Sequence, residues 1–218
     1  MSDVNRTRRY VSRLRDDGAR QTRRLVLAAA MELFAAQGYV STTVEQIADR
    51  AGVSKPTVFA SVGSKRTVLK ELRDLALAGD EEPIPVIERP WYQEVLTEPD
   101  PRRSLRLYAR NVVRIQQRGA EMEEVLRNAA AADPELRDLW QASEDERRVG
   151  ARTVVDALLL KGPLKPGLDR DAAIDVLWVL TAGDAYRRLV GSRGWPIQRY
   201  EQWLADTYCT QLLGTPHA

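Results

Sequence analysis

Few of the side chains that carry catalysis or bind metals occur in this sequence. Its 218 residues contain one histidine, His217, and one cysteine, Cys209. A single imidazole and a single thiol speak against histidine-based catalysis, a zinc site and an intrachain disulfide. Carboxylates do cluster, at Glu81–Glu82, Glu123–Glu124 and Glu144–Glu146, but in polar runs typical of solvated helix faces or loops. The sequence therefore predicts no enzyme, no cofactor and no metal site.

The basic side chains are distributed unevenly along the chain. Residues 1–70 carry 13 Lys and Arg against 6 Asp and Glu, whereas residues 71–218 carry 20 against 25. A basic N-terminal part on an acidic body predicts that the N-terminal part binds nucleic acid. No apolar run reaches the roughly 18–20 residues of a membrane span, so we expect a cytoplasmic protein without a membrane partner.

The stretch IADRAGVSKPTVFASVGSK, residues 47–65, combines helix-ending and helix-starting residues within a few positions. Gly52 suits a left-handed helix C-cap, Ser54 suits an N-cap, and Pro56 is tolerated in a first helical turn. The stretch therefore predicts two short helices joined by a tight corner, a helix-turn-helix. An ordinary corner between two helices, without a role in binding, is the alternative.

The rest of the chain predicts an all-α fold. We expect a basic mobile arm over 1–19, a helix-turn-helix DNA-binding domain over 20–64 and a helical domain over 65–218. Expected helices of the first part are 21–37, which ends at Gly38, then 44–51 and 55–61. A fourth helix over 65–78 precedes a stiff proline-rich linker over 79–90. Body helices are expected over 101–118, 120–132, 134–161, 169–190 and 198–213.

The N-terminal part also resembles a known family. The motifs A-x-x-L-F-x-x-x-G-Y (residues 30–39) and T-T-V-x-x-I-A-x-x-A-G-V-S (residues 42–54), followed by Ser64–Lys65, are similar to the DNA-binding domain of the tetracycline-repressor (TetR) family. The resemblance implies a ligand-responsive transcriptional regulator, in most cases a repressor. Such a protein binds double-stranded DNA at a palindromic operator as a homodimer, and a small effector releases it. The helical second domain would then serve ligand binding and dimerisation.

The resemblance also implies which residues contact DNA. Lys55, Pro56, Thr57 and Phe59 match the base-reading face, while core packing is the alternative for Phe59. Thr43 and Lys65 match positions that hold phosphates, and Ser54 and Ser61 flank the reading helix. Where the family usually has tyrosine and a longer side chain, this sequence has Phe59 and Ser61. We expect three arginines of the arm to replace those contacts, Arg8, Arg9 and Arg13. A solvated tail without a role in binding is the alternative.

The body carries no motif of its own. Tyr108, Asn111, Met122, Trp140 and Trp178 are candidates for the wall of an effector pocket, with plain core packing as the alternative for each. Their aromatic character favours a largely apolar effector. The last two expected helices are apolar on both sides and would pair with their copies in a dimer, through Leu180, Gly183, Trp203 and Tyr208. A regulator of the same fold controlled by a protein partner, and an all-α enzyme, are the alternative functions.

Overall fold

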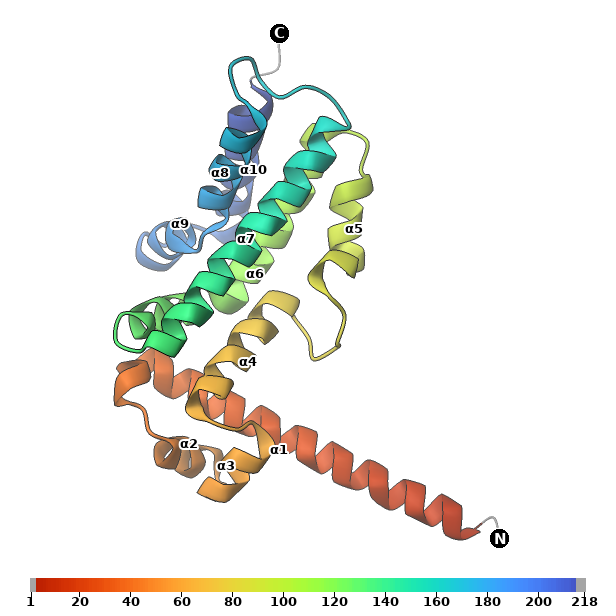
Figure 1. Ribbon diagram of the computed structural model, residues 1–218, viewed down its shortest axis with the longest axis vertical. Coiled ribbons are helices and arrows are strands. Elements are labelled where there is room, and N and C mark those ends of the chain that lie inside the picture. The colour runs from red at the N-terminus through yellow and green to blue at the C-terminus, as the bar shows by residue number, and fades with distance from the viewer. Residues whose placement is uncertain (1–2, 215–218) are drawn as a thin grey trace.

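The chain is helical throughout the part that the structure describes. The computed structural model describes the backbone of residues 3–214 and the side chains of residues 17–214, and this part contains helices and no strand. Figure 1 shows the first four helices together at one end of the molecule and the remaining helices beyond them. The expectation of an all-α fold is confirmed.

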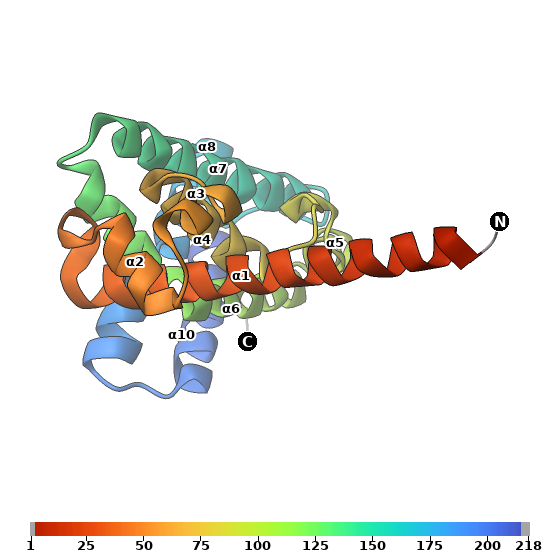
Figure 2. The same cartoon turned by 90° about the horizontal axis from the view of Figure 1, so that it is seen from below.

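Four helices form the N-terminal end: α1 (Asp3–Ser41), α2 (Val44–Ala51), α3 (Lys55–Ser61) and α4 (Lys65–Ala78). The regular helix is interrupted at Gly38, where φ is 80°, as expected. The N-terminal half of α1 extends away from the other helices in two perpendicular views (Figures 1 and 2). Where the sequence predicts a mobile arm, the backbone is helical from Asp3 onward. Residues 3–17 contain neither Gly nor Pro, and Arg favours helices, so nothing in this stretch ends the helix.

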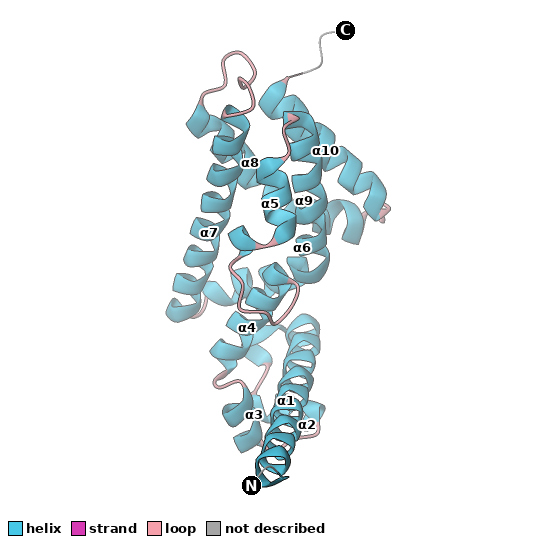
Figure 3. Cartoon of the chain, turned by 90° about the vertical axis from the view of Figure 1, so that its right-hand side faces the viewer, coloured by secondary structure: helices cyan, strands magenta, loops and turns pink. Residues whose placement is uncertain are grey.

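The body begins with a 3₁₀ turn, η1 (Val86–Glu88), and continues through helices that pack side by side (Figure 3). Its α-helices are α5 (Pro90–Thr97), α6 (Pro101–Ala130), α7 (Pro134–Leu159), α8 (Arg170–Thr181), α9 (Asp184–Tyr186) and α10 (Ile197–Leu213). A π-helical segment, η2 (Arg187–Ser192), follows α9 directly.

Three expectations for the body are wrong. The linker over 79–90 ends in a helix start, because Pro90 occupies the first turn of α5. Gly119 does not divide α6; it allows α4 to approach, since a Cβ there would lie 2.8 Å from the Cβ of Ala76. The single helix expected over 169–190 is broken at Ala182, whose backbone is extended (φ −62°, ψ 148°).

Two hydrophobic clusters stabilise the fold. One lies within the body and contains residues of α5, α6, α7, α8 and α10. The other contains Phe34, Ile47 and Leu69 from the N-terminal helices together with Met122 and Leu136 from α6 and α7. This second cluster crosses the domain boundary that the sequence suggests between residues 64 and 65, so the helix-turn-helix is part of a larger packed unit.

Candidate nucleic-acid interface and internal cavity

The corner between α2 and α3 is fixed by its backbone and its core residues. Gly52 takes the left-handed conformation (φ 67°), and the N–H of Val53 donates to the carbonyl of Ala48 at 3.0 Å. Ile47 and Val58 are fully buried beneath the corner. The corner therefore holds α3 in one orientation, with the side of α3 opposite Val58 facing solvent.

The predicted base-reading residues lie on α3 and at its start. Phe59 is 48% exposed, so the structure places it on the open face and not in the core. Lys55 and Pro56 are exposed as well, whereas Thr57 is half-buried. The hydroxyl of Ser54 accepts from the Thr57 N–H at 3.2 Å and caps the helix.

Charge on the reading helix is partly neutralised within the protein. The Lys55 ammonium pairs with the Glu45 carboxylate of α2, and both side chains are exposed. Hydrogen bonding to Lys55 lowers the pKa of Glu45. Ser61, at the end of α3, donates to the carbonyl of Val58 at 3.2 Å. A DNA phosphate near Lys55 would therefore compete with Glu45 for the ammonium.

The two predicted phosphate contacts, Thr43 and Lys65, also have structural roles. Thr43 begins α2 in a capping box: its hydroxyl accepts from the Gln46 N–H, and the Gln46 side chain accepts from the Thr43 N–H at 2.8 Å. The Lys65 ammonium donates to the carbonyls of Tyr39 (2.9 Å) and Thr42 (2.7 Å) and lies 4.1 Å from the centre of the Tyr39 ring. Burial lowers the pKa of Lys65. Lys65 thus ties α4 to the turn between α1 and α2, and one of its three N–H groups remains for a phosphate.

The arginine contacts predicted for Arg8, Arg9 and Arg13 lie outside the residues whose side chains the structure describes. Further along α1, Arg23 pairs with Glu71 of α4 at 2.8 Å, and Arg24 pairs with Glu81 at 2.8 Å. These two arginines connect α1 to α4 and to the segment that follows it.

A cavity of about 430 Å³ lies in the body, with walls from α4, α5, α6 and α7. Tyr108, Asn111 and Trp140 line it, as the sequence predicts. Asn111 also donates to the carbonyl of Trp91 at 2.9 Å and so positions α5 against α6. The aromatic part of the wall comes from four side chains: Trp91, Tyr92, Tyr108 and Trp140.

Two of the five predicted pocket residues lie elsewhere. Met122 is 1% exposed and packs in the cluster beneath the N-terminal helices. Trp178 is half-buried against the core of the body and is not among the lining residues. Sequence reasoning in turn missed Trp91 and Tyr92, because it assigned residues 79–90 to a linker and no helix to the segment that follows. The Pro-Trp-Tyr sequence at 90–92 was the available indication of a helix start with aromatic side chains.

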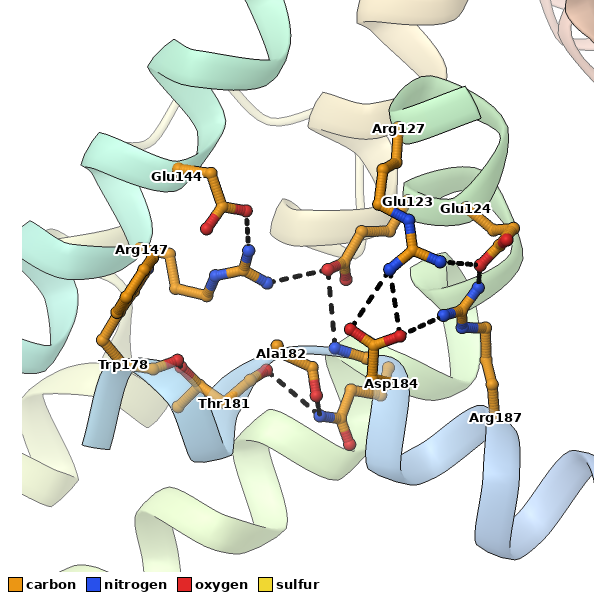
Figure 4. Close-up of polar contacts among 12 residues, drawn as sticks. Glu123, Glu124, Arg127, Glu144, Arg147, Trp178, Thr181, Ala182, Asp184 and Arg187 are labelled. Atoms are coloured by element: carbon orange, nitrogen blue, oxygen red, sulfur yellow. Dashed lines mark hydrogen bonds and ion pairs between the residues drawn. The ribbon is translucent and has the colours of Figure 1, made fainter. Parts of the chain in front are cut away.

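A polar network extends from the cavity wall to the end of α8 (Figure 4). The Glu123 carboxylate accepts from Arg147 of α7 at 2.8 Å, and Arg147 also pairs with Glu144. A few residues away, Arg127 of α6 pairs with Asp184 at 3.0 Å, next to the break between α8 and α9. Gln116 of α6 donates to the carbonyls of Thr181 and Ala182 at that break, both at 3.1 Å. The cavity wall is therefore connected by hydrogen bonds to the end of α8.

The four residues predicted for a dimer interface divide into two groups. Leu180 and Trp203 are half-buried on α8 and α10. Gly183 and Tyr208 lie inside a single chain: a Cβ on Gly183 would meet a Glu123 carboxylate oxygen at 2.9 Å, and Tyr208 is fully buried. Both residues pack within the protomer, because apolar positions on both sides of these helices also serve its core. Val179, which the sequence analysis does not single out, is 60% exposed on α8.

Neither a membrane span nor a metal site emerges from the described part of the chain. None of its helices is both long and apolar enough to cross a bilayer. No group of three or more His, Cys, Asp or Glu side chains among those described could hold a metal ion. Cys209 is buried, and burial raises the pKa of its thiol.

Comparisons with known proteins agree with this geometry. Residues 26–72 match the family model for bacterial regulatory proteins of the tetR family. The chain is 28% identical over 169 residues to YdeS of Bacillus subtilis (strain 168), an uncharacterized HTH-type transcriptional regulator. The aligned region covers 76% of this chain and 77% of YdeS.

Solved structures share the whole fold. NalD, the secondary repressor of the MexAB-OprM multidrug efflux pump in Pseudomonas aeruginosa, superposes with a TM-score of 0.65 at 23% identity over 90% of this chain and 98% of its own. SmeT, the repressor of the Stenotrophomonas maltophilia multidrug efflux pump SmeDEF, was solved in complex with triclosan. That complex superposes with a TM-score of 0.64 at 19% identity, over 88% of this chain and 91% of its own. These structures show the fold. The family match over residues 26–72 and the likeness to YdeS, together with the capped helix-turn-helix, identify the chain as a DNA-binding transcriptional regulator of the tetR family.

Proposed function

We propose that this regulator is a repressor that binds a palindromic operator as a homodimer and leaves it when a small, largely apolar effector enters the body cavity. The observation that carries the proposal is the position of α4. Its first half packs with the helix-turn-helix, through buried Val68 and Leu69, and its second half lines the cavity, through Arg73, Ala76 and Leu77. A compound that occupies the cavity therefore touches the helix on which the DNA-reading end rests.

Further contacts support a mechanical connection between the cavity and α3. Arg118 of α6 donates to the carbonyl of Ala76 at 2.9 Å and so holds the C-terminal end of α4. At the other end of α4, Arg66 pairs with Asp133, the N-cap of α7, at 3.0 Å. Because α4 is held against α6 and α7 at both ends, a displacement of its cavity side would also change the orientation of α3.

The proposed dimer uses α8 and α10. Figure 1 shows these helices side by side, and α8 exposes Val179 with half-buried Leu180 beside it. On α10, half-buried Trp203 is the corresponding apolar residue. A twofold pairing of such faces would present two copies of α3 to major grooves about 34–36 Å apart on one side of the duplex, which suits a palindromic site.

The cavity favours a small molecule over a protein partner as the effector. Its volume of about 430 Å³ is in the range of ligand pockets, and its wall is mostly aromatic and aliphatic. SmeT, which has the same fold, was solved with triclosan. A regulator controlled only through a protein surface would not need a cavity of this size beside α4.

Footprinting of the purified protein on the DNA upstream of its own gene tests the proposal. A protected palindrome is expected, and a metabolite extract is expected to remove the protection. The matched variant is Gly150→Leu: Gly150 lines the cavity, and an added Cβ meets only the Tyr92 hydroxyl, at 3.8 Å. The larger side chain should fill the cavity, so that DNA protection is retained and the response to the extract is lost. A response that survives in Gly150→Leu would place the effector elsewhere.

A further inference from the structure

We propose that the effector is an aromatic compound with one protonated amine, and that Glu123 is the residue that selects its charge. The inference rests on the proposed function, since it assigns a ligand class to the same cavity. It follows from the balance of charge in the wall, from one carboxylate oxygen without a bonding partner, and from the aromatic side chains opposite.

The charged part of the wall contains more carboxylates than guanidinium groups. Glu123, Glu144 and Glu146 line the cavity together with Arg73 and Arg147. Each arginine already serves two carboxylates: Arg147 pairs with Glu123 and Glu144, and Arg73 pairs with Glu146 and Asp74. The wall therefore has an excess of negative charge, which favours a cationic ligand.

An anionic ligand would meet a guanidinium, Arg147, that already serves two carboxylates. Its two terminal nitrogens already bond to Glu123 and Glu144 (Figure 4), so two carboxylates balance the guanidinium charge before a ligand binds. An anion bound there would lie beside the two carboxylates that share this guanidinium, and like-charge repulsion would disfavour it.

Glu123, in contrast, has an acceptor to offer. The bond from Arg147 uses Oε1, which also lies 3.5 Å from the backbone nitrogen of Gly183. No described residue donates to Oε2, and the side chain is 29% exposed in a residue that lines the cavity. An ammonium group bound at Oε2 would form a charge-assisted hydrogen bond without displacing Arg147.

The other walls suit the rest of such a ligand. Trp91 and Tyr92 from α5, Tyr108 from α6 and Trp140 from α7 supply aromatic surface around the cavity. Aromatic rings pack against one another and also attract a nearby cation through the negative faces of their π-systems. The same walls that bury the apolar part of the ligand therefore add to the preference for positive charge.

Three probes of one shape and different charge test the inference. Naphthylmethylamine is protonated at pH 7, naphthylmethanol is neutral, and naphthoate is anionic. Isothermal titration of the full-length protein, without DNA, is expected to show the amine binding about tenfold or more tightly than the alcohol, and the anion binding most weakly. Equal or tighter binding of the alcohol or the anion would overturn the proposal, as would failure of all three probes to bind.

Two neighbouring variants separate local from general electrostatic effects. Glu123→Gln should lower the affinity for the amine about tenfold and leave that for the alcohol within about twofold. Glu124→Gln removes the same charge one residue away, outside the cavity lining, and should leave the order of the probes unchanged. An equal effect of both variants would show that Glu123 does not select the charge.

This result is independent of the proposed function itself. The probes are titrated without DNA, so an operator that responds to no extract would contradict the proposed function and leave the charge preference as measured. An operator released by an extract, together with a protein that prefers the neutral probe, would contradict the charge preference alone.

Discussion

Replacement of Lys65 by methionine should destabilise the protein even in the absence of DNA. Methionine keeps much of the apolar stem but removes the ammonium that bonds to the carbonyls of Tyr39 and Thr42. Hydrogen bonds to a charged group contribute about 1.5–3 kcal/mol each. Since Lys65 is half-buried and water replaces part of the lost bonding, we discount the sum by about half and expect a loss of about 1.5–3 kcal/mol.

The assay is thermal unfolding of the DNA-free protein, followed by circular dichroism. For a chain of this length each kcal/mol corresponds to about 2–4 °C, so the midpoint should fall by roughly 3–12 °C. Lys70→Met is the matched control, because Lys70 lies on the same helix and pairs only with Asp74, both side chains being exposed. Its midpoint should change by no more than about 2 °C.

Salt dependence of operator binding separates the structural role of Lys65 from a phosphate contact. If the third N–H of the ammonium contacts a phosphate, Lys65→Met should also flatten the slope of log K against log salt by about 0.9. An unchanged midpoint with a flattened slope would refute the structural reasoning, because Lys65 would then act on DNA alone.

Three further outcomes are expected. Val179→Glu places a charge on the exposed face of α8, so sedimentation should show monomers and weak operator binding; a variant that stays dimeric would place the interface elsewhere. Lys55→Ala and Thr57→Ala should change which operator sequences are preferred, by about 1–3 kcal/mol per base contact, in a binding-site selection; a uniform loss would move base reading to other residues. Truncation of residues 1–16 should flatten the salt slope by about 2–4 units if two to four of its arginines neutralise phosphates; an unchanged slope would leave them no part in binding.

Local chemistry made the DNA-reading end predictable. Gly52 permits the left-handed cap, the Ser54 hydroxyl caps the next helix, and Pro56 suits its first turn. The corner between α2 and α3 has the caps that these residues predict. The burial of Val58 was predictable for the same reason, since the two caps fix which side of so short a helix faces inward.

The body was less predictable because its glycines and prolines have more than one use. Gly119 has a helical backbone and is needed for the approach of Ala76, a long-range contact that spacing along the chain does not reveal. Pro90 begins a helix, whereas Pro85, five residues earlier, has a non-helical backbone (ψ 143°). Without α5, the sequence could not place Trp91 and Tyr92 in the cavity.

A sequence does not distinguish an apolar residue buried within its own chain from one that faces a cavity or a partner. Met122 and Tyr208 are apolar and lie on helices that face a cavity or an expected partner, yet both are buried within one chain. Which side of such a helix meets its own chain depends on how helices distant in sequence cross, and only the assembled fold determines that.

The hydrophobic cluster shared by the two ends of the molecule limits how such regulators can be recombined. Met122, Val125 and Leu136 of the body complete the core beneath α1 and α4. A chimera joined between α3 and α4 would pack α1, α2 and α3 of one regulator against body side chains of other volumes. Each mismatch in such a core costs about 1–3 kcal/mol. A stable chimera would have to take α4 and the adjoining ends of α6 and α7 from the same regulator as α1, α2 and α3. New operator preferences would therefore be reached with less disruption through exposed positions of α3, such as Phe59, than through exchange of whole domains.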